Sequence, residues 1–156
     1  PDIPPLFIGK LQSNKIKKAV QLCDVIQSVD SLKLAESINR EAQKQRKVQQ
    51  IMLQINIGNE QQKGGIAIED VFHLFKLILH LPHLKIIGIM CIAPDINIYG
   101  EQKVRDCFRE MKQIFDKINK DCNEELQHLS MGMSDDYTIA LQEGSTMLRI
   151  GRKLFE

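Results

Sequence analysis

The sequence has few of the features that mark secreted, membrane or nucleic-acid-binding proteins. Its four cysteines form no Cys-x-x-Cys pair and no secretory signal opens the chain, so we expect free thiols in a reduced, cytoplasmic protein. No apolar run reaches membrane-spanning length, since Phe72 to Leu81 is too short and includes Lys76. The net charge of +1 gives no reason to expect nucleic acid or an anionic membrane as a partner.

Metal ligands, linkers and hairpin turns are also scarce. His80 and His83 flank Pro82, but no third ligand stands near them, so we interpret them as loop residues and predict no metal site. No low-complexity segment or interdomain linker divides the chain, and its length suffices for one core. We therefore expect a single domain over residues 1–156.

Apolar patterning predicts strands and helices in alternation. The predicted strands are Leu6–Gly9, Asp24–Val29, Val48–Ile57, Leu84–Ile92, one beginning at His128, and Met147–Gly151. The predicted helices follow a cap at Ser13, run from a cap at Asp30-Ser31 to about Gln45, and cover Glu69–Leu81, Glu101 to about Cys122, and Tyr137–Glu143. Strands joined by helical crossovers are parallel, and such repeats form either an eight-stranded barrel or an open doubly wound sheet.

The strand from Val48 to Ile57 has one apolar and one mixed face. Leu53 and Ile55 share the apolar face, whereas Met52 and Gln54 lie on the other. Because helices would cover the apolar face, we expect the mixed face to point into a lumen or a site.

The stretch from His128 to Gly151 carries the candidate site. Ser134 is a good N-cap for the short helix, with Asp135 and Asp136 in its first turn and Gly144 just beyond its end. A helix N-terminus of this kind favours anions.

Arg149 lies on the same strand face as Met147 and Gly151. A buried guanidinium needs an anionic or acceptor partner, and a glycine lets a ligand approach the backbone closely. Residue types alone leave two interpretations open: a structural ion pair, or an anion-binding site formed by Arg149, Gly151 and Ser134.

Three motifs resemble one known family. They are Ser-Met-Gly-Met-Ser-Asp-Asp at 130–136 with Gly-Ser-Thr-Met-Leu-Arg-Ile-Gly at 144–151, Phe-Ile-Gly-Lys-Leu-Gln-Ser-Asn-Lys at 7–15, and Leu-Gln-Ile-Asn-Ile at 53–57 with Lys-Gly-Gly-Ile at 63–66. Together they resemble the signature of the pyridoxal-phosphate homeostasis family, formerly called proline-synthetase-associated. The barrel of that family resembles the N-terminal domain of alanine racemase.

The resemblance implies a parallel (β/α)8 TIM-type barrel of the alanine racemase N-terminal-domain kind. An eightfold barrel typically needs roughly 250 residues, so six strands leave two unaccounted for. The motif at 7–15 belongs to the third strand and helix of the family barrel. We therefore expect residues 1–156 to be a partial barrel of family strands three to eight, without the first two units and the final helix.

The resemblance also implies a pyridoxal 5′-phosphate (PLP) site. It assigns Ser134 and the backbone around Gly151 to the phosphate, and Arg149 to the pyridine nitrogen. Arg152 stands where the family has serine or threonine, which leaves two interpretations open: an arginine that pairs with the phosphate by charge, or one that points into solvent. Lys10 stands where the family has histidine or proline. The family's Schiff-base lysine lies on the first barrel strand, which we expect in the missing N-terminal part.

The implied function is a non-enzymatic PLP carrier or regulator in intracellular vitamin B6 homeostasis, with no catalytic residues and with PLP-dependent apoenzymes as possible recipients. A racemase-like enzyme is one alternative, although that fold needs a second, β-rich domain with a catalytic tyrosine. Another phosphate-binding barrel enzyme is a second alternative, for which Asp95, Asp135 and Asp136 are the available loop acids. The sequence leaves the oligomeric state open.

Overall fold

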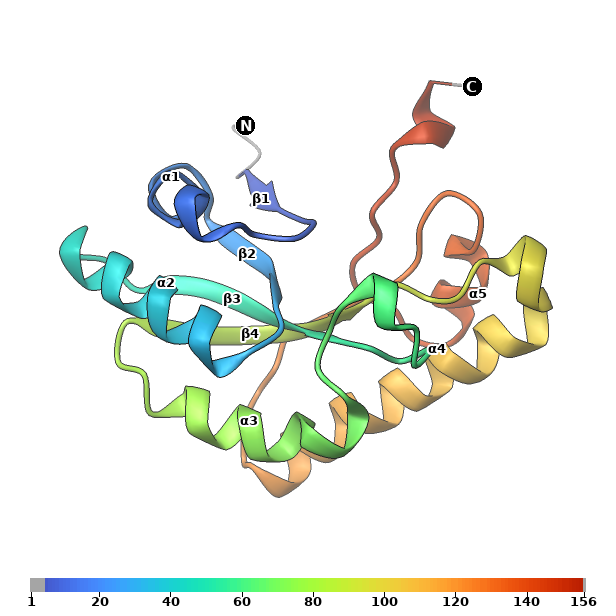
Figure 1. Ribbon diagram of the computed structural model, residues 1–156. Coiled ribbons are helices and arrows are strands. Elements are labelled where there is room, and N and C mark those ends of the chain that lie inside the picture. The colour runs from blue at the N-terminus through green and yellow to red at the C-terminus, as the bar shows by residue number, and fades with distance from the viewer. Residues whose placement is uncertain (1–4, 156) are drawn as a thin grey trace.

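A computed structural model describes residues 5–155 as a curved parallel sheet with helices on its outer side (Figure 1). The strands pair in sequence order: β1 (Leu6–Phe7), β2 (Val25–Val29), β3 (Gln49–Ile55), β4 (Leu84–Cys91) and β5 (His128–Ser130). The helices are α1 (Ile16–Leu22), α2 (Leu32–Lys44), α3 (Val71–Leu79), α4 (Ile96–Asp121) and α5 (Tyr137–Gln142). The predicted parallel α/β fold and its partial-barrel form are confirmed.

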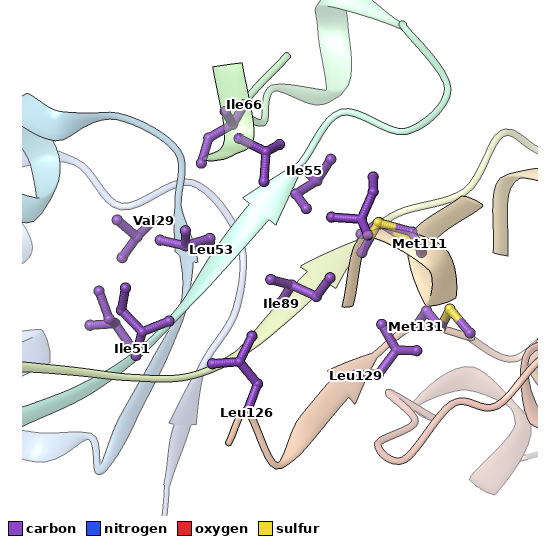
Figure 2. Close-up of a cluster of buried hydrophobic side chains, with 14 of the residues drawn as sticks. Val29, Ile51, Leu53, Ile55, Ile66, Ile89, Met111, Leu126, Leu129 and Met131 are labelled. Atoms are coloured by element: carbon purple, nitrogen blue, oxygen red, sulfur yellow. The ribbon is translucent and has the colours of Figure 1, made fainter. Parts of the chain in front are cut away.

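The main core lies between the outer face of the sheet and the helices. Leu53 and Ile55 of β3 are almost fully buried there, together with Phe75 of α3 and Phe108 of α4. Figure 2 shows strand side chains of this cluster gathered from β2 to β5. Burying one such side chain contributes about 1.5–3 kcal/mol, so this layer is the main stabilising feature of the domain.

The concave face of the sheet carries a second, smaller cluster. Met52 of β3 packs there with Val25, Ile87 and Met90, and Met147 is packed against them from the C-terminal segment. The two predicted faces of the third strand are therefore confirmed, with Met52 turned away from the helices.

Strands β4 and β5 approach each other unusually closely at Gly88. Gly88 pairs with His128, and a Cβ at position 88 would lie 2.1 Å from the His128 carbonyl oxygen. Only glycine fits this contact, so the small residue in β4 allows β5 to join the sheet.

Helix starts follow the predicted caps only in part. Ser31 caps α2 by accepting a hydrogen bond from the Leu34 N–H at 3.2 Å, as predicted. Ser13 instead begins a 3-10 turn, and Lys15 occupies the N-cap of α1 without a side-chain bond. The longest helix starts earlier than its predicted beginning at Glu101: a helical turn that Asp95 caps comes first, and Gly100 (φ 80°) separates this turn from the rest of α4.

The predicted strand at Met147–Gly151 is reduced to a single parallel bridge between Met147 and Ser130. The segment stays close to β5, and the Arg149 N–H donates to the Gly132 carbonyl at 3.0 Å. The reason lies in the segment beside it: β5 ends at Ser130, and the backbone turns away at Gly132, where φ is +102°. Beyond Ser130 the chain is therefore no longer an extended strand with which residues 148–151 could form a regular parallel ladder.

The predicted capping role of Ser134 is wrong. Helix α5 begins at Tyr137, and Asp136 takes the N-cap position. The Asp136 carboxylate accepts from the Met133 N–H at 2.6 Å, while the Met133 carbonyl accepts from the Tyr137 N–H at 2.9 Å. These bonds close a turn ahead of the helix, so Ser134 lies in the loop. Gly144 follows the helix with φ +95°, as predicted.

Candidate functional site

A groove of about 660 Å³ brings all four predicted site residues together. Arg149, Gly151 and Arg152 line it from the C-terminal segment, and Ser134 lines it from the loop after β5. Leu6 and Ile8, around strand β1, and Gln27 of β2 complete the wall across the concave side. Ligand sites of parallel α/β barrels lie where strands end and loops begin, which is the position of this groove.

Arg149 is half-buried beside neutral partners. Its Nη1 donates to the Ser130 hydroxyl at 2.8 Å, and its Nη2 donates to the Cys91 carbonyl at 2.6 Å. Among residues 5–155, no carboxylate lies within ion-pair distance of this guanidinium. Burial lowers the pKa of Arg149, while Cys91 and Asp136 counteract that effect through their charges. The structural ion-pair interpretation therefore fails for residues 5–155, since no carboxylate among them pairs with Arg149.

Ser134 and the C-terminal turn contact each other at the edge of the groove. The Ser134 hydroxyl accepts from the Lys153 N–H at 3.3 Å. Arg152 pairs with Asp135, which neighbours Ser134 in the same loop. The Ser134 hydroxyl, the backbone of the C-terminal turn and the Arg152 guanidinium, which are the groups predicted to contact a phosphate, therefore lie close together.

Gly151 faces open space. A Cβ built at this position meets no atom within 4 Å, and φ is −125°. No steric contact with the rest of the chain therefore requires glycine here, and a ligand close to the backbone would explain it.

Sequence reasoning missed three residues of the site. Gln27 and Ser130 are almost fully buried behind Arg149, and their hydrogen bond joins two strands far apart in the sequence. Asp136 fixes the Ser134 loop, and burial raises the pKa of its carboxyl, against the opposing effects of the Met133 N–H and Arg149. The motif at 130–136 contains Ser130 and Asp136. The partner of Ser130, Gln27, can be recognised only from the curved sheet, which brings β2 and β5 together.

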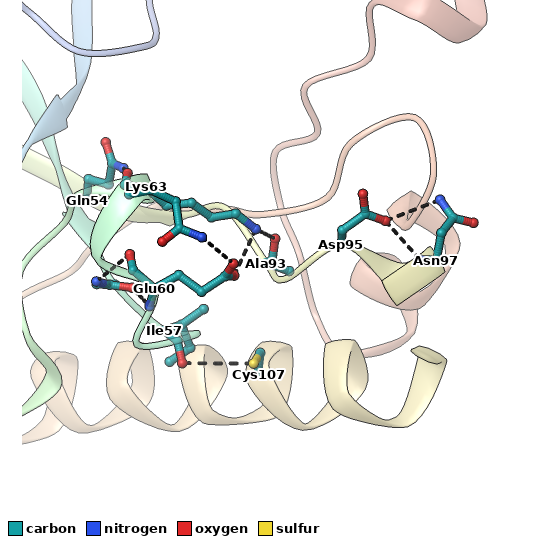
Figure 3. Close-up of polar contacts among 10 residues, drawn as sticks. Gln54, Ile57, Glu60, Lys63, Ala93, Asp95, Asn97 and Cys107 are labelled. Atoms are coloured by element: carbon teal, nitrogen blue, oxygen red, sulfur yellow. Dashed lines mark hydrogen bonds and ion pairs between the residues drawn. The ribbon is translucent and has the colours of Figure 1, made fainter. Parts of the chain in front are cut away.

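A second cavity of about 560 Å³ lies over the ends of β2 and β3, and Lys10 lines this cavity and not the Arg149 groove. Its rim includes Lys63, whose ammonium is already engaged by Glu60 at 2.9 Å and by the Ala93 carbonyl at 2.8 Å (Figure 3). The Gln54 amide also donates to the Lys63 carbonyl. These contacts hold the loop after β3 against the segment that follows β4.

The remaining candidates are structural. Cys91 and Cys107 are buried free thiols, and burial raises the pKa of Cys91 to about 12, so this thiol is unreactive. His80 and His83 lie in the turn region after α3, and the described part of the chain contains no group of residues suited to hold a metal ion. Among the same residues, no helix has the length and apolar character of a membrane span.

Comparison with known proteins assigns the chain to a family. The model of the alanine racemase N-terminal domain matches residues 2–156. A pyridoxal phosphate homeostasis protein of Synechocystis is 38% identical over 154 residues, which make up 99% of this chain and 70% of that protein. The chain belongs to the pyridoxal phosphate homeostasis protein family. Relatives with the same description from Aquifex aeolicus and Haemophilus influenzae are each 40% identical over 96% of this chain.

Solved structures agree with the family assignment. PipY of Synechococcus elongatus, solved with PLP bound, superposes with a TM-score of 0.89 at 33% identity, covering 100% of this chain and 72% of PipY. Alanine racemase of Clostridium difficile has the same fold, with a TM-score of 0.78 at 17% identity over 99% of this chain and 40% of the racemase. This chain spans 64% of the Aquifex protein and 62% of the Haemophilus protein.

Proposed function

We propose that this chain forms part of a PLP-binding protein that holds the cofactor in the Arg149 groove and takes part in vitamin B6 homeostasis. The observation that carries this proposal is Arg149 itself. A half-buried guanidinium with two neutral acceptors, and with no carboxylate at ion-pair distance among residues 5–155, has further N–H donors to offer a ligand in the groove. The names of the relatives and PLP in the PipY structure support the same ligand.

The residues fit the two ends of PLP. We assign the pyridine nitrogen to Arg149 and the phosphate to Ser134, the Gly151 backbone and Arg152. When bound, the cofactor supplies an aldehyde and an electron-accepting ring. A guanidinium donates hydrogen bonds and keeps its own proton, so it holds the ring nitrogen unprotonated and weakens that electron-accepting power. This is better suited to a carrier than to carbanion chemistry.

The loop acids also support a carrier role. Asp135 pairs with Arg152, Asp136 accepts from the Met133 N–H, and Asp95 caps a helical turn. Each has a structural partner, so none is placed as an obvious general acid or base. We infer a protein that binds PLP and releases it to PLP-dependent apoenzymes, built as a barrel of which residues 1–156 form one partial domain.

Equilibrium titration with PLP and with pyridoxal tests the proposal in the full-length protein. Ser134→Ala should weaken PLP binding by about tenfold, the effect of removing one hydrogen bond to a charged group, and should leave pyridoxal binding unchanged. Its melting temperature without ligand should stay close to wild type, because Ser134 does not cap α5. Equal losses for the two ligands would contradict the phosphate assignment.

A further inference from the structure

We propose that Gln27 and Ser130 are positioning residues that set the orientation of Arg149 and so the preference of the groove for an aromatic ring nitrogen. This inference rests on the proposed PLP site and adds two residues, Gln27 in the wall of the groove and Ser130 beside Arg149, that act through Arg149. It is carried by a continuous chain of hydrogen bonds across the concave face of the sheet.

In this series of hydrogen bonds, each donor and each acceptor is defined. The Ser130 hydroxyl donates to the Gln27 Oε1 at 2.8 Å, so its oxygen lone pairs remain for the Arg149 Nη1, also at 2.8 Å. The Gln27 amide is oriented in turn by its Nε2, which donates to the Met147 sulfur at 3.4 Å. A serine hydroxyl has one proton, and Gln27 therefore keeps Ser130 in the acceptor role that Arg149 needs.

Burial makes this arrangement rigid. Gln27 is 1% exposed and Ser130 is fully buried, so water cannot replace either partner. Gln27 belongs to β2 and Ser130 to β5, with β3 and β4 between them in the sheet. Their side chains meet only because the sheet curves, so the bond ties the shape of the partial barrel to the orientation of Arg149.

The second anchor of Arg149 limits its remaining freedom. The Cys91 carbonyl at the end of β4 holds Nη2, and Ser130 holds Nη1. With both ends fixed, the guanidinium presents the rest of its N–H donors in one direction. Without Ser130 as an acceptor the group could rotate about the Cys91 contact, and its alignment with a ring nitrogen would be lost.

The test uses Gln27→Met and Ser130→Ala in the full-length protein, with Ser37→Ala as the control because the Ser37 hydroxyl contacts Lys33 and Arg40 within α2, away from Arg149. Two ligands are titrated: PLP, and an analogue in which the ring nitrogen is replaced by C–H. We expect each test variant to lower the preference for PLP over the analogue by about tenfold, as for a hydrogen bond to a charged group, and the control to leave it unchanged. Equal weakening of both ligands, or an unchanged preference in a variant that folds, would overturn the proposal.

A measurement without ligand separates this inference from the proposed function. Nitrogen-15 NMR of the Arg149 guanidinium should show faster rotation and proton exchange in Gln27→Met than in wild type and in Ser37→Ala. If the rates are the same, Gln27 does not position Arg149, whatever the protein binds. If the rates differ as expected but wild-type protein binds no PLP, the proposed function fails and the positioning chain stands.

Discussion

At Gly151 we expect a substitution to change ligand affinity without changing the stability of the fold. A Cβ at this position meets nothing within 4 Å in the folded chain, but it would project into the space that we assign to the phosphate. Gly151→Ala should therefore keep the melting temperature of the ligand-free protein and weaken PLP binding by tenfold or more, on the order of one lost phosphate contact. Thermal unfolding and PLP titration give both values. A stability loss without a change in affinity would mean that the glycine serves the fold.

Asp136 contributes a pH dependence of known sign. Burial raises the pKa of its carboxyl above 3.8, so the folded protein holds this proton more tightly than the unfolded chain. The stabilisation that this group provides is complete below its ordinary pKa and is lost as the pH rises through the raised value.

Asp136→Asn isolates this effect because an amide oxygen can still accept from the Met133 N–H. The free energy of unfolding of the variant, minus that of wild type, should rise as the pH increases through the range just above 3.8 and should level off at higher pH. Urea unfolding at a series of pH values measures the difference. A difference that falls over this range would show that the carboxylate is stabilised in the fold by its neighbours.

At the scale of elements, the pairing of β4 with β5 depends on Gly88. A methyl group there would lie 2.1 Å from the His128 carbonyl oxygen, and this contact is with backbone that cannot rotate away. Gly88→Ala should therefore cost roughly 3 kcal/mol or more, at the upper end of the overpacking range. Because β5 carries Ser130, affinity for PLP should fall as well. Gly151→Ala is the matched control for the stability measurement, since the same added methyl group has open space there.

Most elements could be predicted from the sequence because their signals are local. The alternation of Met52 and Leu53 and the cap at Ser31 depend on residues close together in the chain, and both are confirmed. The loss of the final strand and the identity of the α5 cap could not be predicted, because they depend on the turn at Gly132 and on the carboxylate of Asp136, although the predicted start of α5 at Tyr137 is confirmed. Local propensity favours Ser134 as a cap, and a stronger local bond network displaces it.

The same distinction holds for the site. Arg149 and Gly151 stand out in the sequence because an arginine in an apolar strand needs a partner and a glycine leaves room, and the structure brings both into one groove with Ser134. Gln27 and Ser130 could not be predicted, since their contact spans 103 residues and forms only when the sheet curves. Site residues that act through another side chain give no signal in the local pattern.

At the scale of the whole molecule, we expect Arg149 to be held for a ligand and not for the fold. Its partners are neutral acceptors, so Arg149→Met should lower the free energy of unfolding of the ligand-free protein by roughly 1–3 kcal/mol, the range for a buried acceptor that loses its donor. Breaking a buried ion pair would instead cost roughly 3–5 kcal/mol.

The most direct test is therefore paired: PLP titration and urea unfolding of wild type and Arg149→Met in the full-length protein. We predict a stability loss below roughly 3 kcal/mol without ligand and at least a roughly tenfold loss of PLP affinity, the equivalent of one hydrogen bond from a charged group. Equal PLP affinity in the two proteins, or a large loss of stability with affinity retained, would contradict the assignment of Arg149 to the cofactor.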